Sequence, residues 1–145
     1  MAAGEVLITR VEGVNGMWNH ERRGTKVLLV DDEPSVQAVL MRRLQAEGYD
    51  VVTASDGEEA LKKAGLEHPD VILLDIMLPK MSGNAVAAEL HDRKETAHIP
   101  VIFITCLVNN AEARVMSYMS GGNRIMGKPV DSDDLIDLIE QARNT

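Results

Sequence analysis

The chain has 145 residues, enough for one domain with a buried core, and it is 45% hydrophobic, 26% charged and only 3% aromatic, so aliphatic side chains must fill the interior. Its net charge of −8 argues against nucleic acid as a direct partner, because contact with phosphates needs clustered Lys and Arg. No stretch approaches the roughly 18 apolar residues of a membrane span, and the N-terminus has no apolar signal core, so we expect a soluble cytoplasmic protein without membrane contact.

Cysteine chemistry is nearly absent from the sequence. Cys106 is the only cysteine, which excludes an internal disulfide and a multi-cysteine metal site. So few cysteines are typical of proteins in a reducing cytosol. We expect Cys106 to be a buried structural thiol.

The first 25 residues differ in character from the rest of the chain. They contain four glycines and a polar stretch, Asn19–Gly24, and their charges balance, so the whole negative surplus lies in residues 26–145. We interpret residues 1–25 as a loosely ordered extension and residues 26–145 as the folded domain. Vector-derived residues, or upstream read-through with Met17 as the true start, are equally compatible with this composition.

Beyond the extension, five segments have the composition of β-strands. Three are continuous apolar runs, Val27–Val30, Val71–Leu74 and Val101–Ile104, and two are weaker candidates, Tyr49–Thr53 and Asn123–Met126. Runs that are apolar at every position suit strands covered on both faces, which is the habit of parallel sheets.

Helical patterns separate these segments. Apolar residues recur at helical spacing after Pro34, Asp56, Ser82 and Asp131. Proline suits a first helical position, Asp56 and Ser82 can accept hydrogen bonds from first-turn amides, and an acidic stretch from Asp131 suits the positive end of a helix dipole. The alternation predicts an α/β domain with a parallel sheet, whose ligand site lies beyond the carboxyl ends of the strands.

Three of the strand runs end in a residue able to do chemistry. The first apolar run leads into Asp31 and Asp32, the second into Asp75 and the third into Thr105. If these strands are neighbours, three carboxylates meet at one edge of the sheet and need a cation. Oxygen ligands that leave positions open for water and phosphate suit Mg²⁺ best. The residues alone leave open which carboxylate reacts and which hold the ion.

Lys128 precedes Pro129 at the end of the last candidate strand, which brings an ammonium to the same edge. A metal, a carboxylate nucleophile, a lysine and a hydroxyl together form an aspartyl-phosphate site. Each residue alone has a plainer interpretation, since a strand-end Asp is more often a cap and Thr105 is most often a strand residue. Their joint occurrence at the ends of separate strands favours the chemical interpretation.

These residues resemble the receiver domains of two-component response regulators. The resemblance runs from about Lys26 to Ala142. It rests on five segments: Val27–Pro34, Asp56–Leu61, Pro69–Pro79, Ile99–Thr105 and Lys128–Pro129. It implies a flavodoxin-like, doubly wound α/β fold with five parallel strands in the order 2-1-3-4-5 and five helices.

By position, the resemblance makes Asp75 the phosphoacceptor. It makes Asp31 and Asp32 the acidic pair that holds Mg²⁺, together with Asp75 itself and the backbone carbonyl of Met77. The domain would take a phosphoryl group and change a surface that it shows to a partner.

The remaining family roles fall on Thr105 and Lys128. Thr105 resembles the hydroxyl that moves toward the phosphoryl group, and Lys128 resembles its ion-pairing partner. The phosphoryl donor would be a phosphohistidine on a sensor histidine kinase or a histidine phosphotransfer protein. The chain would not be an enzyme beyond its own phosphorylation and slow self-dephosphorylation at Asp75.

One position departs from the family pattern. Ile125 stands three residues before Lys128, where the family usually has Tyr or Phe, and a β-branched side chain is stiff at χ1. The aromatic part of the switch is therefore not expected here. A phosphorylation-independent interaction module is the alternative function.

Two other classes of protein fit the sequence poorly. Phosphohydrolases that resemble haloacid dehalogenases carry an inserted cap and place a second Asp two residues after the nucleophile, where this chain has Met77. A flavin carrier of similar fold would have a Ser/Thr-Gly-rich phosphate loop after the first strand. The output protein stays unknown, and both a stand-alone regulator and a part of a longer regulator or hybrid kinase are compatible with the sequence.

Overall fold

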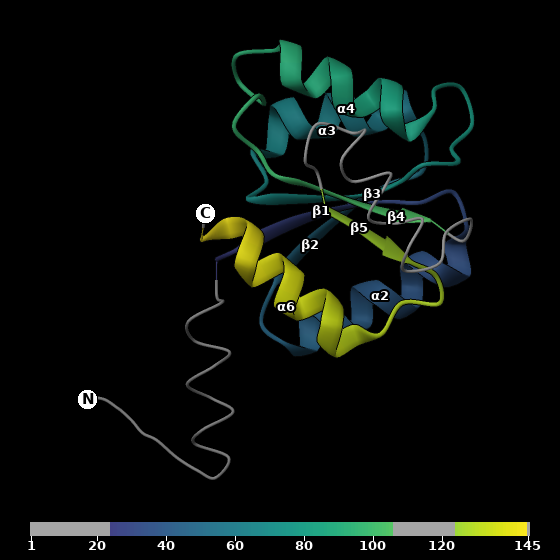
Figure 1. Cartoon of the computed structure of the whole chain (residues 1–145), viewed down its shortest axis with the longest axis vertical. Helices are drawn as coiled ribbons and strands as arrows, with labels where there is room; N and C mark the ends of the chain where they lie inside the picture. The colour runs from purple at the N-terminus through teal and green to yellow at the C-terminus, as the bar shows by residue number, and fades with distance from the viewer. Residues whose placement is uncertain (1–23, 106–123, 145) are drawn as a thin grey trace, which may run out of the picture.

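Five parallel strands form the centre of the molecule (Figure 1). The computed structural model describes residues 24–105 and 124–144. The strands are β1 (Lys26–Val30), β2 (Asp50–Ala54), β3 (Val71–Asp75), β4 (Val101–Thr105) and β5 (Arg124–Gly127). They pair in the order β2-β1-β3-β4-β5, and every neighbouring pair is parallel. The expected flavodoxin-like sheet and its strand order are confirmed.

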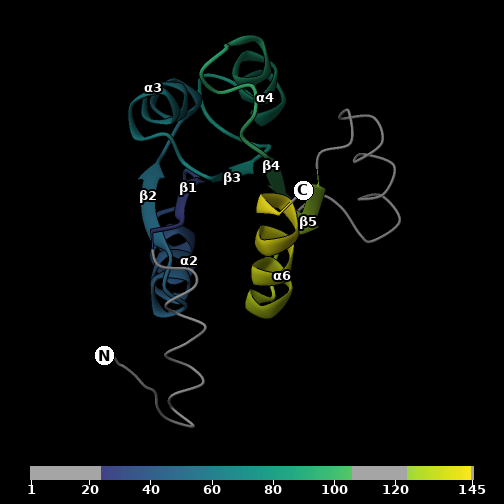
Figure 2. The ribbon, with the colours of Figure 1, turned by 90° about the vertical axis from the view of Figure 1, so that its left-hand side faces the viewer.

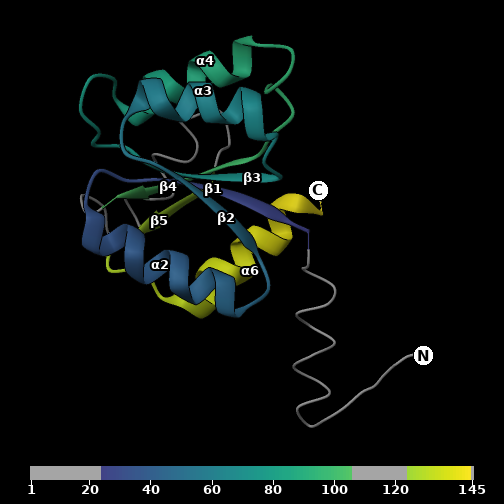
Figure 3. The same cartoon turned by 180° about the vertical axis from the view of Figure 1, so that it is seen from behind.

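Helices cover both faces of this sheet. Within the described residues they are α2 (Pro34–Ala46), α3 (Gly57–Glu67), α4 (Gly83–Asp92) and α6 (Ser132–Arg143). Figure 2 and Figure 3 show α2 and α6 on one face and α3 and α4 on the other. Three expectations lie outside the described residues: the helix between β4 and β5, the thiol of Cys106, and residues 1–23 of the extension. Among the described helices, none has the length and apolar character needed to cross a membrane.

The strands distribute their side chains between two apolar layers. Val27 and Leu29 of β1 pack in the layer next to α2 and α6, whereas Leu28 and Val30 pack in the layer next to α3 and α4. This alternation follows from the period of two residues in a strand. Because β3 and β4 are buried along their whole length, both of their faces are covered, as the continuous apolar runs predict.

The helix starts follow the sequence signals. Pro34 occupies the first turn of α2. Asp56 caps α3 by accepting a hydrogen bond at 2.8 Å from the amide three residues on, and Ser82 caps α4 in the same way at 3.2 Å. Asp131 accepts from two first-turn amides of α6. Each cap fixes the point at which a loop from the carboxyl edge of the sheet becomes a helix.

Strand β2 begins one residue later than expected. The N–H of Tyr49 donates to the carbonyl of Leu44 at 3.1 Å, so the backbone of this buried residue still closes the turn after α2. Pairing with β1 starts at Asp50, opposite Lys26. At β5, Asn123 lies outside the described residues, and the strand runs one residue beyond the expected end.

Candidate functional site

The parallel sheet brings three carboxylates together at its carboxyl edge. Asp31 follows β1 directly, and Asp75 is the last residue of β3, the strand beside β1. Each of Asp31, Asp32 and Asp75 offers one carboxylate oxygen, and these oxygens lie within 4.8 Å of one another. We call these three residues the acidic triad. The expected meeting of strand-end carboxylates is therefore confirmed.

Two members of the triad are buried, which is unusual for carboxylates. Asp31 is 2% exposed and Asp75 is 5% exposed, whereas Asp32 is exposed. Burial raises the pKa of Asp75 above its ordinary value, and the neighbouring charge of Asp31 acts in the same direction. Hydrogen bonds from the Met77 N–H and the Lys128 ammonium oppose this rise in the Asp75 pKa. The protein thus holds Asp75 in surroundings that disfavour its unneutralised charge.

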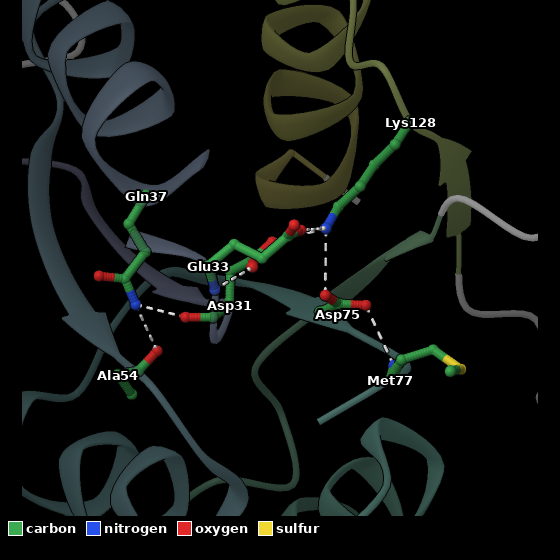
Figure 4. A network of polar contacts seen from close by, with 7 residues as sticks. All are labelled: Asp31, Glu33, Gln37, Ala54, Asp75, Met77 and Lys128. Carbon is green, nitrogen blue, oxygen red and sulfur yellow. Dashed lines mark hydrogen bonds and ion pairs between the residues drawn. The ribbon is translucent and has the colours of Figure 1, made fainter. Parts of the chain in front are cut away.

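The ammonium of Lys128 lies among these groups (Figure 4). Lys128 follows β5, and its Nζ lies 2.8 Å from Asp31 Oδ2 and 3.1 Å from Asp75 Oδ2. A third carboxylate, that of Glu33, lies 3.2 Å from the same Nζ. Burial alone would lower the pKa of Lys128, but the three hydrogen-bonded carboxylates raise it above the ordinary value. The ammonium therefore stays charged at any physiological pH.

The other two expected site residues lie at the same edge. The Met77 N–H donates to Asp75 Oδ1 at 3.0 Å, while the Met77 side chain is 58% exposed. Thr105, the last residue of β4, is fully buried, and its carbonyl accepts a hydrogen bond from the Lys128 N–H at 2.8 Å. The roles expected of the Met77 carbonyl and the Thr105 hydroxyl stay predictions.

The loop between β3 and α4 lies in close contact with the strand end. The Gly83 N–H donates to the Ile76 carbonyl at 2.8 Å, and a Cβ at Gly83 would lie 2.7 Å from the Ile76 Cα. On the outer side of the loop, Lys80 Nζ lies 3.3 Å from the Asp56 carboxylate, which caps α3. These contacts fix the main chain that carries Met77.

Sequence reasoning missed two residues of this network, Glu33 and Gln37. The Glu33 N–H donates to Asp31 Oδ1 at 2.9 Å, and its carboxylate contacts Lys128. The Gln37 amide donates to the Asp31 carbonyl at 2.5 Å. Position next to the acidic pair was the available signal for Glu33. Gln37 had no such signal, because a polar residue in an early helix turn usually faces solvent.

The chemistry of the donors suits a hard divalent cation. The acidic triad offers only oxygen ligands. The Lys128 ammonium contacts two of its members, Asp31 and Asp75, and also Glu33. Carboxylate oxygens at this spacing are the ligands of Mg²⁺, Mn²⁺ or Ca²⁺, and zinc prefers nitrogen or sulfur. The residues present therefore fit the expected metal.

Residues 27–140 match the family model of the response regulator receiver domain. The chain belongs to this family. It is a receiver domain of the two-component type, and its acidic triad lies where such domains are phosphorylated. The resemblance drawn from the strand-end motifs is confirmed.

Relatives of known name share this part of the chain. The alkaline phosphatase synthesis transcriptional regulatory protein PhoP of Bacillus subtilis is 44% identical over 104 residues, which cover 72% of this chain and 42% of that protein. Response regulator PleD of Caulobacter vibrioides is 42% identical over 106 residues, which cover 73% of this chain and 23% of that protein. The receiver domain thus spans less than half the length of either relative.

Solved structures show the same fold over the whole of much shorter chains. A CheY-like receiver domain protein from Methanospirillum hungatei JF-1 superposes with a TM-score of 0.72 at 28% identity, covering 83% of this chain and 94% of that one. The receiver domain of a sensor histidine kinase from Pseudomonas aeruginosa PAO1 gives 0.75 at 27% identity, covering 84% and 99%. The latter was solved with a magnesium ion coordinated in its active site cleft.

Proposed function

We propose that this receiver domain takes a phosphoryl group from a phosphohistidine onto Asp75, in a step that requires Mg²⁺, and thereby changes the surface that it shows to a partner. The observation that carries this proposal is the buried Asp75 carboxylate, which lies within 4.8 Å of two further carboxylates and 3.1 Å from the Lys128 ammonium. Such a group needs added positive charge, and a phosphoryl transfer with Mg²⁺ needs a carboxylate in this position.

The transfer forms one bond and breaks one. A carboxylate oxygen of Asp75 bonds to phosphorus while the P–N bond of the phosphohistidine breaks, and the released imidazole takes a proton from solvent. Little covalent work is left for the protein, so positioning and charge neutralisation supply most of the catalysis. The Met77 N–H, at 3.0 Å from Asp75 Oδ1, holds the carboxylate in a fixed orientation for this attack.

Several neighbours of Asp75 would take part in neutralising the negative charge of the site. Asp31, Asp32 and the Met77 carbonyl would hold Mg²⁺ together with Asp75, and the ion would balance the phosphoryl oxygens and the triad. The Lys128 ammonium, which binds the Asp75 carboxylate here, can bind a phosphoryl oxygen instead. In this proposal the chain promotes only its own phosphorylation and slow dephosphorylation at Asp75, with the phosphohistidine as donor.

The change of surface runs through Thr105 and Lys128. A phosphoryl group on Asp75 offers new acceptors, and the Thr105 hydroxyl at the end of the neighbouring strand β4 is the proposed donor. Ile125 is partly buried and packs against the layer of α3 and α4, without the aromatic ring that the family usually has there. A swinging ring at this position is therefore not part of the proposed change.

The kinase and output partners follow from family membership at a coarse level only. A receiver domain implies a cognate histidine kinase or phosphotransfer protein, and we place their encounter in the cytoplasm. Two relatives are named transcriptional regulators, and the matches cover 42% and 44% of their lengths, so the proposal names no output partner. The presence of Asp31, Asp32, Asp75 and Lys128 in one network argues against a phosphorylation-independent module.

Intact-protein mass spectrometry after incubation with phosphoramidate, with and without Mg²⁺, tests this proposal. We expect wild type to gain one phosphoryl mass only when Mg²⁺ is present, and we expect Asp75→Asn to gain none. A Mg²⁺-independent gain would contradict the metal requirement, and an equal gain in Asp75→Asn would contradict the proposed acceptor.

The metal role of the exposed member of the triad has its own test. We expect Asp32→Ala to fold as wild type does but to need a higher Mg²⁺ concentration for half-maximal binding in a calorimetric titration, because one oxygen ligand is lost. Equal Mg²⁺ affinity in this variant would place the metal elsewhere.

A further inference from the structure

The side chain of Gln37 joins α2 to the ends of two strands. Its amide nitrogen, Nε2, donates to the Asp31 carbonyl at 2.5 Å and to the Ala54 carbonyl at 3.0 Å, as Figure 4 shows. A glutamine amide carries two N–H donors, so each carbonyl can receive one. A partly buried side chain from a helix thereby ties together the carboxyl ends of β1 and β2.

These two carbonyls lie where the ladder of the sheet ends. The last paired residues of β1 and β2 are Val30 and Ala54, and one further bond follows, from the Asp31 N–H to the Ala54 carbonyl at 3.1 Å. With Gln37 in place, the Asp31 main chain is held on both sides, by its N–H and by its carbonyl. Without Gln37, only the N–H would be held.

The orientation of the Asp31 carboxylate depends on that main chain. Asp31 Oδ1 accepts from the Glu33 N–H at 2.9 Å, a contact within the same turn, and Oδ2 lies 2.8 Å from Lys128 Nζ. A shift of the turn would move both contacts together. Asp31 is almost fully buried, so water cannot replace what it loses.

We propose that Gln37 is a positioning residue for the acidic triad, which sets the affinity of this site for Mg²⁺ by holding the Asp31 main chain. The proposal rests on the proposed function, because it assumes that Asp31 is a ligand of the ion. The Gln37 amide binds backbone carbonyls and not a carboxylate of the triad, so it would act on the ion only through Asp31.

The size of the effect follows from the behaviour of residues that support metal ligands. Removal of such a partner typically weakens metal binding by 10- to 100-fold. Gln37 holds a backbone carbonyl and not the ligand oxygen itself, so we place its effect at the low end, about tenfold.

The test compares Gln37→Met with Gln45→Met by calorimetric titration of the full chain with Mg²⁺. Gln45 is an exposed residue of the same helix, so the two variants undergo the same chemical change at different places. We expect the dissociation constant for Mg²⁺ to rise about tenfold in Gln37→Met and to stay at the wild-type value in Gln45→Met. Urea unfolding with EDTA present checks that both variants fold.

Three results would overturn the inference. An unchanged Mg²⁺ affinity in Gln37→Met means that Asp31 keeps its place without the amide, and equal losses in both variants mean that any change in α2 has this effect. Wild-type protein that binds no Mg²⁺ in the millimolar range would overturn the proposed metal site as well, which tells the two failures apart.

A milder pair of variants keeps the test decisive if Gln37→Met does not fold. Gln37→Asn retains the amide on a shorter side chain that cannot reach both carbonyls, and Gln45→Asn carries the same helix penalty. We expect Mg²⁺ affinity to fall only in Gln37→Asn, by less than in Gln37→Met. Equal affinities in this pair would also overturn the inference.

Discussion

Acidic side chains lie at both ends of the sheet, but the groups that bind their carboxylates differ. At the amino ends, the Lys26 ammonium lies 3.0 Å from the Glu67 carboxylate, and the Lys26 N–H donates to Asp70 at 2.7 Å. Each of these two carboxylates has a donor of its own, and both are partly open to water. Neither of these two carboxylates is buried.

At the carboxyl ends, several carboxylates share one charged donor. Asp31, Asp75 and Glu33 share the single ammonium of Lys128, and Asp32 adds a further carboxylate within the triad. Two of these groups are buried, where like charges repel one another most strongly. Among the described residues, the amino edge therefore holds acidic side chains that face water, whereas the carboxyl edge holds buried carboxylates that share one ammonium and leave negative charge for a cation to neutralise.

The largest expected effect comes from removing the cation at each end in turn. Lys128→Met would leave Asp31 and Asp75 buried without an ammonium, so we expect its free energy of unfolding in EDTA to fall by about 3 kcal/mol. Lys26→Met removes a more exposed pair and should cost less than about 1 kcal/mol. Urea unfolding measures both variants. Equal losses would mean that the two ends do not differ as described.

Addition of Mg²⁺ sharpens this comparison. A divalent ion in the triad replaces part of the missing charge, so we expect it to restore part of the stability of Lys128→Met. The stability of Lys26→Met relative to wild type should be the same with and without the ion.

A smaller loss is expected where the loop after β3 lies close to the strand end. Gly83→Ala would place a Cβ 2.7 Å from the Ile76 Cα and against the Asp75 carbonyl, so we expect a loss of about 2 kcal/mol from overpacking. Gly65→Ala is the control, because its Cβ would meet nothing within 4 Å in α3. Alanine in a helix interior should stabilise that variant by about 0.5 kcal/mol. A tolerated Gly83→Ala in urea unfolding would contradict the close packing.

The smallest expected effect depends on pH. The pKa of Asp75 is raised by burial, so its protonated form stabilises the folded state, and that stability is lost as the pH rises through the raised pKa. Without Mg²⁺, Asp75→Asn should therefore match wild type in acid and become the more stable protein as the pH approaches neutrality. Urea midpoints over a pH series measure this difference.

Asp56→Asn is the control, because the pKa of Asp56 is shifted in the opposite direction to that of Asp75. The Glu59 N–H, followed by the contact with Lys80, lowers the pKa of Asp56, so its charged form stabilises the fold and this stability is lost as the pH falls through the lowered pKa. Asparagine can still cap α3, so only the charge is removed. We expect Asp56→Asn to be the less stable protein near neutrality and to match wild type in acid. If both variants changed in stability in the same direction near neutrality, the stated causes of the two pKa shifts would be contradicted.

The fold was predictable from the sequence where the burial of apolar side chains alone decides the structure. The β1, β3 and β4 runs are apolar at every position because both sheet faces are covered, and that pattern has few other interpretations. The start of β2 was misplaced because Tyr49 is apolar enough for a strand, while its backbone belongs to the turn after α2. Composition alone does not show where a hydrogen bond goes.

The site was predictable to the extent that strand ends locate it. Asp31 and Asp75 end neighbouring strands, so parallel pairing alone brings them together. Gln37 reaches the Asp31 carbonyl from the start of α2, a contact that no sequence pattern indicated, whereas Glu33 stands beside the acidic pair in the sequence. The sequence therefore located the acidic triad and Lys128 and missed Glu33 and the Gln37 amide.

Reductive trapping of the phosphorylated protein tests the central claim most directly. Borohydride reduces an acyl phosphate to an alcohol, so protein treated with phosphoramidate and Mg²⁺ and then with borohydride should yield a peptide with homoserine in place of Asp75. Peptide mass spectrometry identifies the position. Homoserine in place of Asp75 alone is the result that this account predicts, and homoserine in place of Asp31, Asp32 or Asp70 would contradict it.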